Sequence, residues 1–115
     1  MNVDWERINS FIDEDNEEER DWLKEMIGTL ISNYEERLTD LNEIIKKQDK
    51  EGLISLLHQM KGITANFGLE KLRQITLSAE SLAKGNNVSA SILETQNLFK
   101  VWEETKSELK TKMGI

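Results

Sequence analysis

The chain has 115 residues, a formal net charge of −7, and neither proline nor cysteine. This length suits one domain over residues 1–115, and the lack of cysteine excludes disulfides, thiolate metal sites and cysteine nucleophiles. Basic residues are interspersed with acids, which argues against nucleic-acid binding, and no apolar stretch approaches the roughly 20 residues that cross a membrane. The N-terminus carries no recognisable export signal, so we expect a cytoplasmic protein that makes no membrane contact.

Apolar residues recur at spacings of three and four along most of the chain, which is the pattern of amphipathic helices. A short helix that carries Trp5 and Ile8 precedes a long one, whose apolar stripe runs from Leu23 to Ile45. Three further helices are separated from it and from each other by QDKEG, by Gly68 and by KGNN. The expected helices span residues 4–12, 17–48, 50–67, 69–84 and 90–112.

Local signals mark several helix ends. Asp49 is expected to cap the N-terminus of the helix over residues 50–67, and Gly68 is expected to end it. Ser89 or Ser91 is expected to cap the last helix. Short connections make each helix pack on its neighbours in sequence, so the predicted fold class is all-α, an antiparallel up-down four-helix bundle with a short additional N-terminal helix.

The only histidine, His58, lies in the helix predicted over residues 50–67. At about 100° per residue, the apolar side chains of this helix gather opposite His58, which therefore points outward. The core stripe defined in this way contains Leu53, Leu56, Met60, Ile63 and Phe67. On the side of His58, Lys61 follows one turn later and Gly62 follows at i+4, although a mid-helix glycine costs about 1 kcal/mol relative to alanine. We interpret Gly62 as a place where another molecule approaches the helix backbone.

An exposed imidazole that is largely neutral near pH 7 offers one ring nitrogen as a nucleophile. If the electrophile is a phosphoryl group, its oxygens need a neutralising charge, which Lys61 is placed to supply. No metal site is expected, because zinc needs three or four N or S ligands and the chain holds one such residue. Acid–base catalysis is disfavoured because His58 has no carboxylate at i±3 or i±4. These residues alone leave open a structural bundle with a chance exposed histidine.

The segment LLHQMKGITANFGLEKL, residues 56–72, resembles the signature of histidine-containing phosphotransfer (HPt) domains of two-component phosphorelays. In that signature the phosphorylated histidine is followed by a hydrophobic residue at i+2, Lys-Gly at i+3 and i+4, a glycine at i+10 and a leucine near i+14. The matching residues are His58, Met60, Lys61, Gly62, Gly68 and Leu72. The departures are Leu57, where alanine is usual, and Ile63 and Thr64, where small residues are frequent.

The resemblance implies a phosphorelay intermediate that accepts a phosphoryl group on His58 Nε2 from the aspartyl phosphate of one receiver domain and passes it to the aspartate of another. The implied partners are receiver domains of response regulators and of a hybrid histidine kinase. The protein would be a monomeric phosphocarrier and not an enzyme, with no cofactor of its own and with Mg²⁺ brought by the receiver.

Individual roles follow from the same resemblance. Lys61 would stabilise the phosphoryl charge, and Gly62 would give clearance to the receiver. The residues expected to line the binding surface are Ile54, Leu57, Gln59, Ala65 and Asn66. The alternative function is a helical adaptor that binds a receiver or kinase domain without being phosphorylated.

Overall fold

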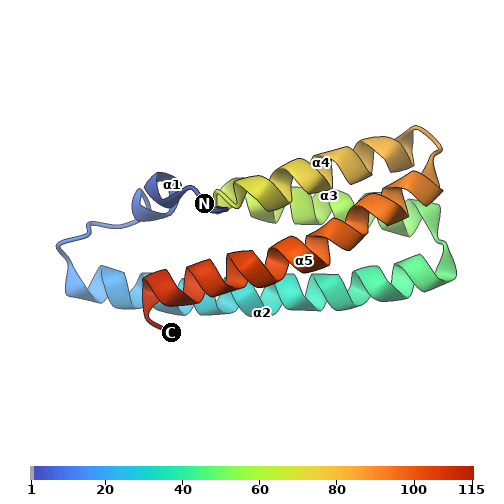
Figure 1. The fold of residues 1–115 in the computed structure, drawn as a ribbon. Coiled ribbons are helices and arrows are strands. Elements are labelled where there is room, and N and C mark those ends of the chain that lie inside the picture. Colours follow the sequence, from blue (N-terminus) through green and yellow to red (C-terminus); the bar gives the residue numbers. More distant parts are fainter. Residues whose placement is uncertain (1) are drawn as a thin grey trace.

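A computed structural model describes residues 2–115 of the chain. These residues form helices and connecting turns, and no strand occurs among them. The helices are α1 (Trp5–Asn9), α2 (Glu17–Lys47), α3 (Lys50–Asn66), α4 (Glu70–Lys84) and α5 (Val88–Met113) (Figure 1).

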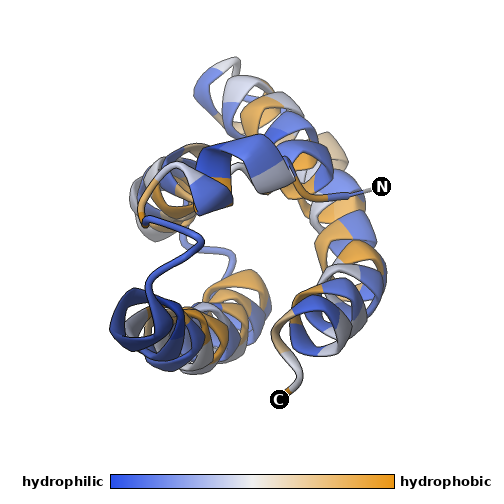
Figure 2. Ribbon diagram, turned by 90° about the vertical axis from the view of Figure 1, so that its left-hand side faces the viewer, coloured by the Kyte–Doolittle hydropathy of each residue, from blue (hydrophilic) through white to orange (hydrophobic). Residues whose placement is uncertain are grey.

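Helices α2 to α5 form an antiparallel bundle in which each helix packs on its neighbours in sequence and α5 returns to pack on α2 (Figure 1). Figure 2 looks along the bundle and shows the hydrophobic segments turned largely toward the space between the helices. The core includes Tyr34 of α2 and Trp102 of α5, whose ring centroids lie 4.5 Å apart. The all-α bundle predicted from the apolar spacing is confirmed.

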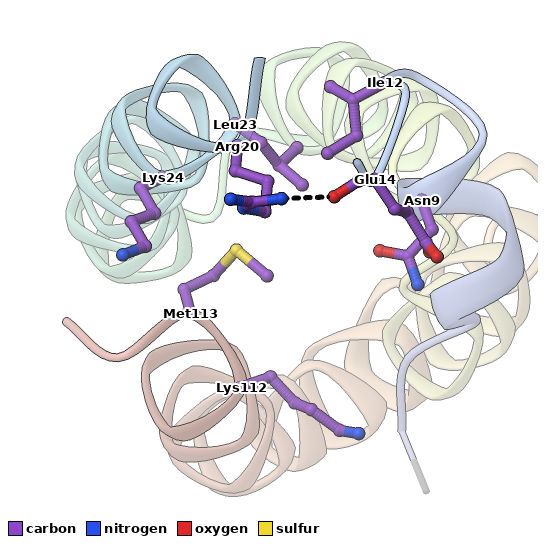
Figure 3. Close-up of a pocket in the computed structure, with 8 residues that line it drawn as sticks. All are labelled: Asn9, Ile12, Glu14, Arg20, Leu23, Lys24, Lys112 and Met113. Carbon is purple, nitrogen blue, oxygen red and sulfur yellow. Dashed lines mark hydrogen bonds between the residues drawn. The ribbon is translucent and has the colours of Figure 1, made fainter. Parts of the chain in front are cut away.

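The bundle helices differ greatly in length. α2 and α5 have 31 and 26 residues, whereas α3 and α4 have 17 and 15. The start of α2 and the end of α5 therefore project beyond the α3–α4 pair, and α1 lies over that end of the bundle (Figure 1). A cavity of about 240 Å³ remains there, lined by Asn9, Ile12, Glu14, Arg20, Leu23, Lys24, Lys112 and Met113 (Figure 3). None of these residues belongs to α3 or α4, so the cavity is separate from the helix that carries His58.

The N-terminal helix is shorter than predicted. It ends at Asn9 and not at residue 12, because Ser10 turns the chain and donates its hydroxyl hydrogen bond to the carbonyl oxygen of Arg7 at 2.6 Å. The main-chain N–H of Asp4 donates to the carbonyl oxygen of Gly68 at 2.7 Å. This bond fastens the N-terminal segment to the turn between α3 and α4.

The start of α5 also differs from the prediction. Its N-cap is Asn87, whose side chain accepts the N–H of Ala90 at 3.2 Å, so the expectation of Ser89 or Ser91 is wrong. Ser91 is buried, and its hydroxyl donates to the carbonyl oxygen of Ala79 at 2.7 Å. The serine that fits a capping pattern therefore links α5 to α4.

Candidate functional site

The candidate nucleophile lies near the middle of α3, which has well-defined ends. The carboxylate of Asp49 caps the first turn by accepting the N–H of Gly52 at 3.0 Å. Beyond the other end, Gly68 has a φ of 66°, in the left-handed region that glycine adopts without strain. Both predicted end signals are confirmed. Between them His58 points outward, with 69% of its side chain exposed.

Gly62 leaves an open gap one turn from His58. It is exposed, and a Cβ atom placed on it would meet no atom of the neighbouring side chains within 4 Å. Nothing inside the bundle therefore requires glycine at this position. Gly28 on α2 is equally free of contacts, so an open glycine alone does not mark a site. The place of Gly62 beside an exposed imidazole distinguishes it.

The buried face of α3 is broader than the predicted stripe. Leu57 and Thr64 are fully buried, whereas Ile63 and Phe67 are only partly buried. The reason is that α3 packs against both α2 and α4, so that side chains directed toward either neighbour are covered. Leu57 therefore belongs to the core, and the prediction that it contacts a receiver is wrong.

Behind His58 lies a carboxylate from the neighbouring helix. Glu80 of α4 has only 6% of its side chain exposed. Its Oε1 accepts a hydrogen bond from Lys61 Nζ at 2.9 Å and lies 3.5 Å from Lys84 Nζ. Its Oε2 lies 3.4 Å from Nδ1 of His58. One acid thus joins three basic side chains across the α3–α4 interface.

The surroundings of Glu80 keep it ionised near neutral pH. Burial acts to raise the pKa of this carboxyl group, but the hydrogen bond from Lys61 and the charges of Lys61, Lys84 and His58 outweigh it. The pKa of Glu80 is therefore lowered from its ordinary value. A negative charge is held beneath the exposed imidazole.

The geometry distinguishes the two ring nitrogens of His58. Glu80 Oε2 is buried and makes no hydrogen bond within residues 2–115, although Nδ1 lies near it. A proton on Nδ1 is attracted by that carboxylate oxygen, 3.4 Å away, which favours the Nδ1–H tautomer. In this tautomer Nε2 carries the free lone pair, on the far side of the ring from Glu80. Nε2 is then the ring nitrogen that is able to act as a nucleophile.

The other candidate residues surround this centre to different degrees. Lys61 is already bound to Glu80 and keeps 28% of its side chain exposed, so it is not a free surface cation. Ile54 is half-buried, and the exposed residues are Gln59, Ala65 and Asn66. The carbonyl oxygen of Asn66 accepts a hydrogen bond from Arg7 Nε at 3.1 Å, so this residue also anchors the N-terminal segment. Their roles in binding stay predictions.

Glu80 is the residue of the candidate site that sequence reasoning missed. Periodicity along the helix of His58 finds carboxylates only on that helix, whereas Glu80 belongs to the next one. Two signals were present. Glu80 follows Ala79 on the buried stripe of α4, where an acid is out of place. In an antiparallel pair that turns at Gly68, a residue about ten positions before the turn faces one about ten positions after it.

The comparisons with known proteins assign the chain to one family. The model of the Hpt domain matches residues 25–111, which is most of the chain and contains α3 and α4 entirely. The search of curated proteins and the search of solved structures each gave no significant match. Within residues 2–115, every helix is too short or too polar to cross a bilayer.

HPt domains act in phosphotransfer in two-component systems, where they interact with receiver domains and serve as phosphocarriers rather than as catalytic enzymes. The extent of the match and the histidine-centred site on a helical bundle lead to one conclusion: the chain belongs to the HPt domain family.

Proposed function

We propose that this protein is a phosphorelay intermediate in which His58 Nε2 accepts a phosphoryl group from the aspartyl phosphate of one receiver domain and passes it to the aspartate of a second. The observation that supports this most directly is the placement of the imidazole. His58 is largely exposed, its Nδ1 faces the buried carboxylate of Glu80, and Gly62 leaves the approach to the ring open.

The proposed transfer needs no proton movement in its first step. The lone pair of Nε2 forms a bond to phosphorus while the bond between phosphorus and the aspartyl oxygen breaks, and the aspartate leaves as a carboxylate. Because Nδ1 keeps its proton, positive charge develops on the ring as the new bond forms. The Glu80 carboxylate, 3.4 Å from Nδ1, stabilises that charge. Transfer to the second receiver reverses these steps.

Lys61 has a double role in this proposal. In the unmodified protein it neutralises Glu80 through the 2.9 Å hydrogen bond. Its long, partly exposed side chain lies on the same face of α3 as His58, one turn away, and can move toward the oxygens of an incoming phosphoryl group. When Lys61 moves toward the phosphoryl group, Lys84 remains beside Glu80 and still partly neutralises its charge. We assign Lys61 to charge stabilisation and Gly62 to clearance for the receiver.

The remaining features of the proposal concern partners and setting. The donor and acceptor would be receiver domains of a hybrid histidine kinase and of a response regulator. Mg²⁺ would be held by the receiver, and the chain would contribute no kinase or phosphatase site. We further propose that the protein acts as a monomer in the cytoplasm.

Label transfer from a phosphorylated receiver tests the proposal. Each receiver domain encoded in the same genome is loaded with radioactive phosphate and mixed with the wild-type protein. We expect label on this chain that is lost in acid and retained in alkali, as phosphohistidine requires. His58→Gln should remove all of it, because His58 is the only histidine. Absence of label on the wild type with every receiver would refute phosphotransfer.

Receiver binding separates this function from that of an adaptor. A receiver that binds wild type and His58→Gln equally tightly, with no label transferred to either, would support the adaptor. Label on wild type from at least one receiver would exclude it.

A further inference from the structure

A groove of about 540 Å³ lies between α2 and α3, on the side of His58 that faces away from Glu80. On α3, at about 100° per residue, Lys61 lies about 60° to one side of His58 and Ser55 about 60° to the other. Lys61 contacts Glu80, whereas Ser55 lines the groove. The residues that line the groove are Arg37, Asp40, Glu43, Ile44, Gly52, Ser55, Leu56 and Gln59.

The charges in this groove are separated along its length. Helices α2 and α3 are antiparallel (Figure 1). Arg37 and Gln59 each lie 11 residues from Gln48, where the chain turns, and so share the end of the groove next to His58, whereas Ile44 and Gly52 each lie 4 residues from it and share the other end. Asp40 and Glu43 follow Arg37 along α2 toward the far end. With a rise of 1.5 Å per residue, the cation and the acids are about 5 to 9 Å apart along the groove.

Arg37 has no partner in the part of the chain that the structure describes. Its Nε is buried without a hydrogen bond, and no carboxylate of residues 2–115 lies within ion-pair distance of its guanidinium. This is unusual in a chain with 22 acidic residues and a net charge of −7, because a partly buried guanidinium normally finds an acid or an acceptor. The two lysines on the other side of His58, Lys61 and Lys84, are both paired with Glu80.

We propose that this groove is a specificity-determining contact for the receiver domain, in which an acidic side chain of the receiver pairs with Arg37 and a basic side chain meets Asp40 or Glu43. The inference rests on the proposed docking of a receiver over His58. A partner that covers the imidazole also covers the adjacent groove, and docking removes water from Arg37. An acid brought by the partner then satisfies the guanidinium in the fork geometry that arginine prefers.

The groove would select among receivers by charge order. A receiver with an acid near its phosphorylation site and a base about 5 to 9 Å further along gains two attractive contacts. A receiver with the opposite order meets like charges at both positions, which disfavours it. The imidazole and Glu80 supply the chemistry, and the groove on the α2 side supplies the choice of partner.

Equilibrium binding of receivers to charge variants tests this inference. For the receiver that binds wild type best, we expect Arg37→Glu to raise Kd by about 10-fold or more at about 0.05 M NaCl and by less at about 0.5 M NaCl. Lys24→Glu is the matched control, because it makes the same charge change on an exposed position of the same helix, about 20 Å away. Its Kd should stay within about 2-fold of wild type.

Two further variants sharpen the test. Arg37→Met keeps an apolar stem and removes the charged guanidinium, so it should raise Kd by about 3- to 10-fold without lowering the thermal midpoint. This separates a docking role from simple packing. In a separate scan, single acidic residues on the receiver surface are replaced by lysine. One of these replacements should restore binding to Arg37→Glu, because the glutamate at position 37 then faces a base.

The outcomes distinguish this inference from the proposed function. If Arg37→Glu and Lys24→Glu bind every receiver equally well while wild type accepts label, the groove proposal is wrong and phosphotransfer stands. If binding depends on Arg37 but no label reaches His58, the groove proposal stands and phosphotransfer fails. Absence of receiver binding to wild type would overturn the groove proposal.

Discussion

Replacing Glu80 with glutamine removes the negative charge beneath His58 and keeps nearly the same side-chain size. In the wild type this carboxylate lies 3.4 Å from His58 Nδ1 and accepts a hydrogen bond from Lys61 at 2.9 Å. The neutral amide can still accept a bond from Lys61, but it no longer attracts a positive imidazole ring. The substitution therefore tests the charge specifically.

The expected loss of rate follows from the geometry. For unit charges 3.4 Å apart, an effective dielectric constant between about 40 and 80, suited to an exposed ring, gives about 1 to 2.5 kcal/mol. Only part of the ring charge has developed in the transition state, so about 1.4 kcal/mol, or a rate about 10-fold lower, is expected. The ring should also lose its preference for the Nδ1–H tautomer.

Two assays report these effects separately. Quenched-flow transfer from a phosphorylated receiver gives the rate, and phosphoramidate, a small phosphoryl donor, gives the rate without docking. Nitrogen NMR of the imidazole gives the tautomer directly, because the chain has a single histidine and its signals need no assignment. The role given to Glu80 would be refuted if Glu80→Gln accepted phosphoryl groups as fast as wild type from both donors and kept the same imidazole tautomer.

Stability should report the same charge through its pH dependence. Glu80→Gln keeps an acceptor for Lys61 but removes the negative charge from this interaction with a partly exposed cation, so the substitution should cost about 1 kcal/mol of unfolding free energy, or about 4 °C in Tm. The pKa of Glu80 is lowered in the folded protein, so the extra stability of wild type is present above the unfolded pKa. It should disappear as the pH falls below about 4.5 and through the folded pKa. If wild type stays more stable than Glu80→Gln at a pH below the folded pKa of Glu80, the extra stability does not come from the charge of Glu80.

Three other substitutions, one of them with a matched control, give further tests. Gly62→Gln should stabilise α3 by about 0.5 to 1 kcal/mol yet abolish receiver transfer, whereas Gly28→Gln, an equally open glycine on α2, should stabilise without affecting transfer. Denaturant unfolding measures the stability of each variant, and label transfer from a receiver measures its activity. If Gly62→Gln still accepts label, Gly62 is not needed as clearance for the receiver. Gly68→Ala should cost about 1 to 3 kcal/mol, since φ is 66° and the new Cβ would lie 3.0 Å from Asp4; an unchanged urea midpoint would disagree. Leu57→Ala should cost about 2 to 5 kcal/mol, because this side chain is fully buried. An unaffected Leu57→Ala protein with weakened receiver binding would return Leu57 to the docking surface.

Features that depend on neighbouring residues in the sequence were predictable. The outward direction of His58 follows from helical periodicity, because the apolar residues of α3 gather on the other side. The ends of α3 follow from Asp49 and Gly68, whose effects need only local backbone geometry. The four-helix arrangement follows from short connections between long amphipathic segments.

Features that depend on contacts between helices were not predicted. Ser91 fits a capping pattern, but its hydroxyl is used by the carbonyl oxygen of Ala79 on another helix. Leu57 looked peripheral because a helical wheel assumes one buried stripe, whereas α3 has two neighbours and a broader covered face. Glu80 reaches His58 only because α4 folds back along α3. In each case the deciding partner is distant in sequence.

The cluster around Glu80 also affects how a partner reaches the protein. Lys61 and Lys84 together outweigh the single acid between them, so this cluster carries a formal charge of +1 on a molecule whose formal net charge is −7. A partner that presents carboxylates is repelled by the net charge of the molecule and attracted by the cluster at short range. This attraction favours the approach of an acidic group on the side of the imidazole, and it weakens as salt rises.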